Sequence, residues 1–285
     1  LQLWMNGLNI GLDLWFVLGL GWGVEGVAIA TLIAEWTGLA LGLWLCAPAF
    51  AARAWANAAR IFERAAPRRM MTVNSDIMIR SVLLQGSFTT FIFLGAGLGD
   101  VTLAANQVLL QFLEITAYAL DGFAFSAEAL VGQAVGARKA RMVRRSAVLA
   151  SQWGVGGAVL LGAGFGLGGG AIIDLMATAP EVREAARLYL PWVAAAPLVG
   201  IASWMFDGIF IGATLTREMR RTMFLSVAIY AAALVVLLPA FGNHGLWAAL
   251  MVLNASRGLT MARHYHRAEA RAAGPAPDGR DGAPA

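Results

Sequence analysis

Residues 137–170 read ARKARMVRRSAVLASQWGVGGAVLLGAGFGLGGG, a basic cluster followed at once by an apolar stretch. From Ser146 to Leu167 the chain carries no charged side chain. A run of about 20 apolar residues is long enough to cross ~30 Å of hydrocarbon as one helix. The same arrangement returns along the chain, which therefore predicts a protein that crosses a membrane several times.

Apolar stretches of this kind predict an all-α polytopic membrane protein with about eight transmembrane helices. The fourth stretch is expected to continue as a helix as far as Val135. The predicted spans cover residues 1–20, 24–46, 77–96, 101–125, 146–167, 189–213, 223–241 and 245–265.

Basic residues form four clusters, and two spans separate each cluster from the next. All four therefore lie on one side of the membrane, which should be the cytoplasm because positive residues concentrate there. We expect a protein of the bacterial inner membrane with a cytoplasmic C-terminus. The clusters are Arg53, Arg60, Arg64, Arg68 and Arg69; Arg138, Lys139, Arg141, Arg144 and Arg145; Arg217, Arg220 and Arg221; and Arg263, Arg267 and Arg271.

Composition excludes most other classes of protein. Hydrophobic residues make up 59% and charged residues 13% of the chain, against roughly 45–50% and 25% in a soluble domain. The net charge is +4, and the basic residues lie at the predicted helix ends. There, binding to anionic lipid headgroups explains them better than binding to nucleic acid.

Cys46 is the single cysteine, so we expect no metal site. No GxSxG, HExxH or P-loop motif occurs, so we expect no catalytic residue, no enzyme and no cofactor.

The chain also contains a candidate internal repeat. A shift of 219 residues places Gly23 and Gly26 on Gly242 and Gly245. It likewise places the aliphatic pair at 17–18 on the pair at 236–237. Because Gly and aliphatic residues are abundant here, chance similarity is the alternative. A true repeat would make the first helical pair a relative of the last, and such repeats are typical of transporters.

Several runs resemble one known family. LNIGLD at residues 8–13 and GWGVEGVAIAT at 21–31 resemble the fifth and sixth helices of the multidrug and toxic compound extrusion (MATE) family. NSDIMIRSVLLQ at 74–85 and LDGFAFSAEALVGQAVGA at 120–137 resemble its DinF-like (DNA-damage-inducible F) branch. Residues 206–212 are also similar.

The resemblance implies a division of the chain, because family members have two lobes of six helices. Residues 1–52 would be the last two helices of an N-terminal lobe, and 53–75 a cytoplasmic linker. Residues 76–266 would be a complete C-terminal lobe, and 267–285 a disordered cytoplasmic tail. On this comparison the chain is N-terminally truncated, and the four helices that it lacks are needed for function.

Polar residues in the first helical pair form a candidate ion site. Asn9 and Asp13 are four residues apart, so they share one helix face. A carboxylate at mid-membrane costs about 2.5–3.5 kcal/mol, so it usually has a task or a partner. The resemblance adds Thr31 and implies that Asn9, Asp13 and Thr31 bind the coupling ion, H+ or Na+. The alternative is a hydrogen-bonded pair that only joins the helices.

A polar row in the predicted span from residue 101 suggests a cavity. Gln107, Glu114, Asp121 and Glu128 recur every seven residues, so they share one helix face that cannot face lipid. Arg80 and Asp207 lie inside other spans as candidate partners of these carboxylates. Gln85 and Asp207 resemble coupling positions of another MATE branch, and the glutamine is a departure from it. The predicted substrate-cavity residues are Arg80, Gln85, Gln107, Glu114, Asp121 and Asp207; Glu128 is expected at the membrane interface.

Together these observations favour a secondary-active multidrug efflux antiporter that exchanges H+ or Na+ for small organic, cationic substrates. Membrane lipid and the substrates are the expected partners. Two alternatives remain open at this point. One is an inactive, truncated transporter fragment, and the other is a lipid-linked flippase of the same superfamily, which would need a strongly cationic cavity.

Overall fold

The computed structural model of the protein describes residues 1–50 and 65–273. These residues form helices and no β-strand, as the apolar stretches predict, and the chain divides into two compact units, Leu1–Arg69 and Met70–Ala285. Among the described residues, six helices are long and apolar enough to cross a membrane. They are α2 (Gly23–Phe50), α4 (Ala65–Ala96), α5 (Asp100–Gly136), α6 (Ala140–Met176), α7 (Pro180–Gly212) and α8 (Thr216–Phe241).

The first unit is a helical hairpin. Its first arm is α1 (Gln2–Asp13), which continues into the π-helical segment η1 (Leu14–Gly19), and its second arm is α2. A Cβ atom on Gly38 would lie 2.5 Å from the side chain of Met5, so the glycine lets the two arms approach closely. At the turn, the buried Phe16 stacks on Trp22 with ring centroids 5.1 Å apart.

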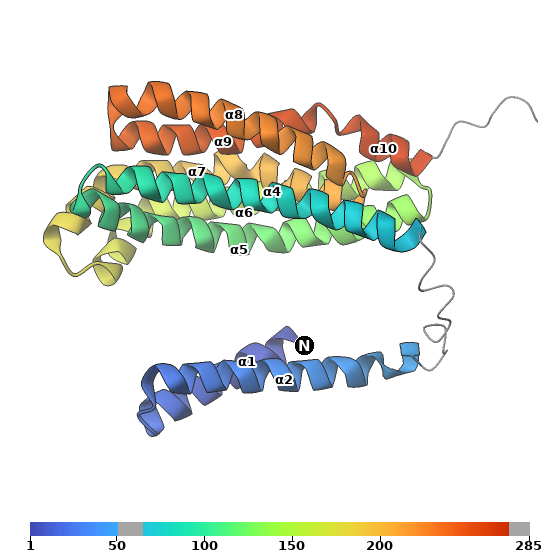
Figure 1. Ribbon diagram of the computed structural model, residues 1–285, viewed down its shortest axis with the longest axis horizontal. Helices are drawn as coiled ribbons and strands as arrows, with labels where there is room; N and C mark the ends of the chain where they lie inside the picture. Colours follow the sequence, from blue (N-terminus) through green and yellow to red (C-terminus); the bar gives the residue numbers. More distant parts are fainter. Residues whose placement is uncertain (51–64, 274–285) are drawn as a thin grey trace, which may run out of the picture. The chain divides into compact units, whose positions relative to one another are not determined.

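The second unit is a bundle of six long helices, α4 to α8 and α9 (Asn243–Ala262) (Figure 1). Helix α7 contacts α5, α6, α8 and α9, and it is the most buried of the six candidate spans. Side chains such as Phe112, Phe210 and Trp247 are completely buried in the core. The predicted spans ending at residues 20 and 265 are helical as well, although α9 and α1 with η1 are not among the six.

Glycines on α7 determine how closely it approaches α5. A Cβ atom on Gly208 would lie 2.1 Å from the backbone oxygen of Ala124, and one on Gly212 would lie 2.4 Å from that of Glu128. The two backbones therefore touch, as small residues permit in membrane bundles. This contact places Asp207, next to Gly208, beside the polar row of α5.

Two predicted segments are helical where the structure describes them. Helix α4 begins at Ala65, so the part of the expected linker from residue 65 to 75 is helical. The expected tail begins as helix α10 (His266–Ala273), whose Ala268 and Ala272 are fully buried. Helix α10 packs these alanines against α5 and α6. This packing explains why residues of polar composition, which the sequence predicts to be a disordered tail, are helical. Arg53, Arg60, Arg64 and the tail from 274 on lie outside the described residues.

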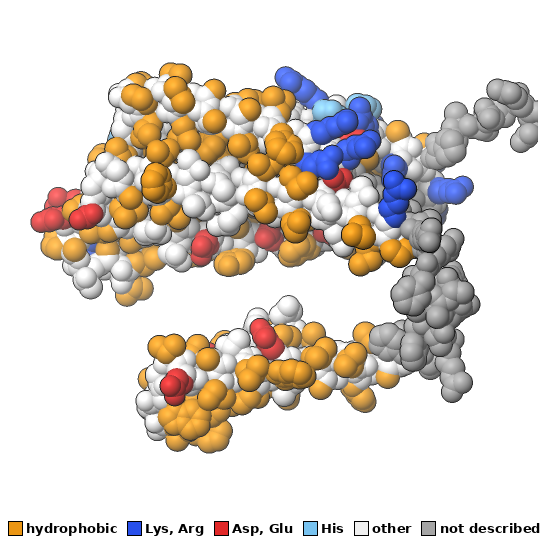
Figure 2. All heavy atoms as spheres, in the orientation of Figure 1, with side chains coloured by type: hydrophobic (Ala, Val, Ile, Leu, Met, Phe, Trp, Pro, Cys, Tyr) orange, Lys and Arg blue, Asp and Glu red, His pale blue; other side chains and the backbone are white. Residues whose placement is uncertain are grey.

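Basic side chains gather at the end of the second unit where α10 lies, and hydrophobic side chains cover its length (Figure 2). Consecutive helices of the bundle alternate in direction, so the turns after α5, α7 and α9 meet at this end (Figure 1). Three of the four basic clusters lie in these turns or in the helical turns that follow them. The three clusters therefore lie on one side of the bundle.

Candidate functional site

A cavity of about 480 Å³ lies among α4, α5, α7 and α9 in the second unit. Its apolar lining includes Phe88, Phe125 and Trp204. All six residues predicted for a substrate cavity line this one space: Arg80, Gln85, Gln107, Glu114, Asp121 and Asp207. Three helices supply them, so the fold brings together side chains that are up to 127 residues apart in the chain.

The polar row of α5 forms one wall of the cavity. Gln107, Glu114, Asp121 and Glu128 all line it, as their spacing of seven predicts, and Gln111 adds a further amide on the same face. Glu128, which the sequence predicts at the membrane interface, lines the cavity together with the other three. Because α5 runs unbroken to Gly136, its last turns carry the same face beyond the apolar segment.

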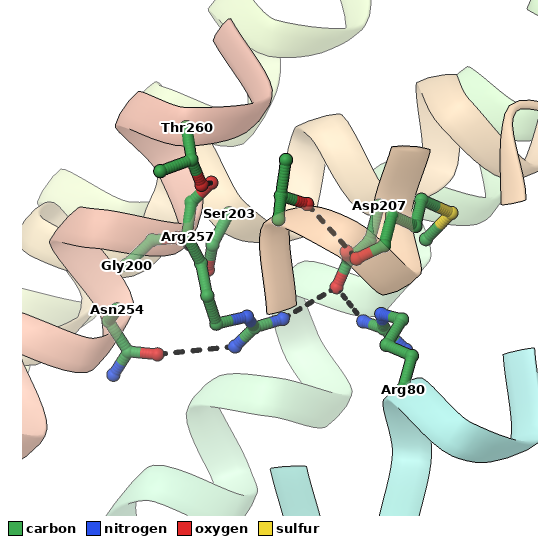
Figure 3. A network of polar contacts seen from close by, with 9 residues as sticks. Arg80, Gly200, Ser203, Asp207, Asn254, Arg257 and Thr260 are labelled. Atoms are coloured by element: carbon green, nitrogen blue, oxygen red, sulfur yellow. Dashed lines mark hydrogen bonds and ion pairs between the residues drawn. The ribbon is translucent and has the colours of Figure 1, made fainter. Parts of the chain in front are cut away.

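Asp207 stands between two arginines from different helices (Figure 3). Its Oδ2 accepts a hydrogen bond from Nη2 of Arg80 on α4 and another, of 2.7 Å, from Nη2 of Arg257 on α9. Arg257 also donates through Nη1 to Oδ1 of Asn254 at 3.3 Å. Asp207 Oδ1 has no hydrogen-bond partner among the described residues. The carboxylate therefore joins α4, α7 and α9 at the wall of the cavity.

The charges of this cluster compensate one another only in part. Asp207 is 9% exposed and Arg257 is 5% exposed, so each would be costly to hold as an isolated charge. One carboxylate serves two guanidinium groups. Asp121 is near enough to interact electrostatically with Asp207 and Arg80, although no ion pair joins it to either arginine in the described part of the chain.

In the first unit, the three residues predicted for an ion site lie together. The Asn9 amide is 3.3 Å from Oγ1 of Thr31. The Asn9 amide is best satisfied in the orientation that exchanges its oxygen and nitrogen. In that orientation its NH2 donates to Asp13 Oδ2 at 3.3 Å and its oxygen accepts from the Thr31 N–H at 3.2 Å. Asp13 Oδ1 is shielded from solvent without a hydrogen-bond partner among the described residues. The segment η1 begins at the next residue, and π-helical turns are frequent at functional sites.

A model of the MatE family matches residues 77–238, more than half of the chain and most of the helices around the cavity. The chain belongs to the MatE family. The resemblance to the MATE family that the sequence runs indicate is thereby confirmed.

Two curated relatives show how much of a MatE protein is present. This MatE chain is 41% identical over 271 residues to DNA damage-inducible protein F of Escherichia coli (strain K12), which covers 92% of the chain and 57% of that protein. It is 25% identical over 252 residues to Protein DETOXIFICATION 42 of Arabidopsis thaliana, covering 86% of the chain and 46% of the relative. The MatE chain thus spans about half the length of the curated relatives it matches.

Solved structures confirm the fold. The Vibrio cholerae MATE transporter VcmN in the bent form matches this MatE chain with a TM-score of 0.78 at 21% identity, over 94% of the chain and 61% of VcmN. A MOP superfamily transporter from Pyrococcus furiosus Vc1, described as having a binding pocket of reverse polarity that suggests a different function, matches with a TM-score of 0.76 at 16% identity, over 94% of the chain and 61% of that transporter.

The sequence interpretation missed Arg257 and Asn254 as members of the cavity. Both lie in the predicted span 245–265, where an arginine must find a polar partner. The available signal was therefore the charge itself inside an apolar stretch. That Arg257 pairs with Asp207 depends on which side of α9 faces α7. The periodicity of a single helix does not predict which neighbouring helix each of its sides contacts.

Proposed function

We propose that this MatE chain belongs to a secondary-active efflux antiporter that exports organic, cationic compounds in exchange for H+ or Na+. The cavity of the second unit carries the proposal. Four carboxylates line it, against two arginines, and aromatic rings stand beside them. Such a cavity favours cationic, apolar compounds. The acidic side chains attract the cationic group, and the aromatic rings contact both the cationic group and the apolar body of the compound.

The ion-coupling residues in this proposal are Asn9, Asp13 and Thr31. A buried carboxylate is costly while charged, so a bound proton or sodium ion removes that cost. Asp13 Oδ1 has no hydrogen-bond partner among the described residues, so it is an acceptor that a proton or a sodium ion would satisfy. Binding of the ion changes the hydrogen bonds between the two arms of the hairpin. Coupling then arises because ion and substrate bind the two conformations of the transporter with different affinities.

The membrane potential is a sufficient source of energy. At roughly 2.3 kcal/mol per charge per 100 mV, one charge moved across ~150 mV supports an accumulation ratio of about a few hundredfold. No nucleotide hydrolysis is required for this. The proposed site of action is the bacterial inner membrane, with the basic end of the second unit and the C-terminus in the cytoplasm.

Dye transport in everted membrane vesicles tests the proposal. Vesicles come from a bacterium without its own dye pumps that expresses the full-length protein, and ethidium fluorescence reports transport. We expect uptake that begins when a pH or sodium gradient is imposed and stops when an ionophore collapses it. Separate proton and sodium gradients identify the coupling ion. Absence of gradient-dependent uptake, with the protein present in the membrane, would contradict the proposal.

A further inference from the structure

The two arginines of the cavity offer far more hydrogen-bond donors than Asp207 can accept. Each guanidinium has five N–H donors. Among the described residues, Arg80 uses one of them on Asp207, and Arg257 uses one on Asp207 and one on Asn254. Both arginines line the cavity. Donors of the two side chains are thus available to a bound molecule.

The charge of this cluster has the same consequence. Within the Arg80–Asp207–Arg257 cluster, which is mostly shielded from water, two guanidinium groups face a single carboxylate, so the cluster itself carries a surplus positive charge. A positive charge in such a place attracts an anionic group strongly, because screening by solvent is weak there. Arginine is also the side chain best suited to hold a carboxylate through two parallel hydrogen bonds.

Carboxylates line the same cavity as these two arginines. Asp121 is close enough to interact electrostatically with Arg80 and Asp207, and Glu114 lies two helical turns, about 10 Å, further along α5. Both line the same cavity. The cavity therefore presents both guanidinium donors and carboxylate acceptors to a bound molecule.

We propose that this cavity binds zwitterionic organic molecules, with the anionic group on Arg80 and Arg257 and the ammonium group on Asp121. The proposal rests on the proposed export function and narrows its substrate class. It differs from a simple cation site in one respect: a carboxylate on the ligand strengthens binding here, although four carboxylates line the cavity.

A matched pair of fluorescent probes distinguishes the two cases. Nε-dansyl-lysine and dansylcadaverine have the same dansyl group, linker and amine, and differ by the α-carboxylate alone. Binding to the purified full-length protein is measured as dansyl emission excited through tryptophan, since Trp204 lines the cavity. We expect dansyl-lysine to bind about tenfold more tightly, the gain typical of a charge-assisted hydrogen bond. Tighter binding of dansylcadaverine would overturn the proposal.

Three variants assign the effect to the arginines. Arg257→Gln should remove the preference for dansyl-lysine, and Arg80→Gln does the same at a side chain that is less buried. Asp207→Asn should increase dansyl-lysine affinity, because the competing carboxylate of the protein is gone. A gain cannot result from misfolding. Thr90→Ala is the matched control, because the Thr90 hydroxyl donates to the Gly86 carbonyl oxygen of its own helix α4, and it should leave both affinities unchanged.

The outcomes separate this proposal from the proposed export function. A preference for dansyl-lysine that is unaffected in both arginine variants would overturn the zwitterion site, whatever the ethidium assay shows. If ethidium transport fails while the preference holds and depends on the arginines, the cavity assignment stands and the export function falls. If ethidium is transported and dansylcadaverine is the tighter ligand, the export of cations stands and the zwitterion site falls.

Discussion

Gly23 and Gly242 have the same backbone torsion, a φ of +55°, at the starts of α2 and α9. The two positions are 219 residues apart, the shift that defines the candidate internal repeat in the sequence. Side chains with a Cβ atom rarely adopt this torsion, so glycine is favoured at both turns, and at Gly242 the ψ of −130° makes the conformation one that glycine adopts most readily. The shared conformation supports an internal repeat in which the first helical hairpin is a relative of the last.

The first turn of α9 leaves no space for a larger residue at Gly245. In Gly245→Ala, the new Cβ atom would lie 2.0 Å from the Leu237 backbone oxygen, so α8 and α9 must move apart. We expect a loss of about 1–3 kcal/mol and a lower melting temperature, followed by tryptophan emission in detergent. Gly156→Ala on α6 meets nothing within 4 Å and is the matched control. Equal melting temperatures of the two variants would refute the close approach.

Much of this fold could be predicted because each long apolar stretch of the sequence determines the position of one helix. The expected helix from residue 101 to Val135 corresponds to α5, Asp100–Gly136. Helices α4, α6 and α7 are longer than their predicted spans because a helix can continue into water after the apolar stretch ends. The sequence marks the segment inside the hydrocarbon, and charged residues such as Arg141 belong to helical turns outside it.

The site was only partly predictable, for a different physical reason. The seven-residue spacing fixes which side chains of α5 share a face, so the polar wall followed from one helix alone. The Arg80–Asp207–Arg257 cluster combines three helices, and its existence depends on how α7 is rotated between α4 and α9. Close approach at Gly208 sets that rotation. A glycine in an apolar sequence does not reveal which backbone it will touch.

Substitutions of two carboxylates test where the ion is coupled. In the full-length protein, Asp13→Asn should insert and fold but abolish gradient-driven ethidium transport, because no group remains that gains or loses a charge there. Asp207→Asn should be milder, since two arginines already neutralise that carboxylate. Transport is measured in everted vesicles and normalised to the amount of protein. The reverse ranking of the two variants would place coupling in the second unit.

An ion pair near the basic end of the second unit should stabilise the bundle. Asp76, 2% exposed, accepts from Arg220 Nη1 at 2.6 Å and from Thr216 Oγ1 at 3.2 Å, which ties α4 to α8. Asp76→Asn should cost about 1–3 kcal/mol by leaving Arg220 unpaired. A double-mutant cycle with Arg220→Gln should then give a coupling energy of about 0.5–3 kcal/mol from thermal unfolding. Additive effects of the two substitutions would show that the contact does not stabilise the protein.

Labelling of single cysteines tests the membrane orientation. In a Cys46→Ala background, which removes the single cysteine of the sequence, Asp100→Cys and Glu181→Cys place thiols at the turns before α5 and α7. Arg141→Cys and Arg263→Cys place them at the opposite, basic end. All four positions are exposed in the structure. Because basic loops remain in the cytoplasm, an impermeant maleimide should label positions 100 and 181 on intact cells, whereas 141 and 263 should react only after the cells are opened. Labelling of position 141 from outside would invert the proposed orientation of the whole bundle.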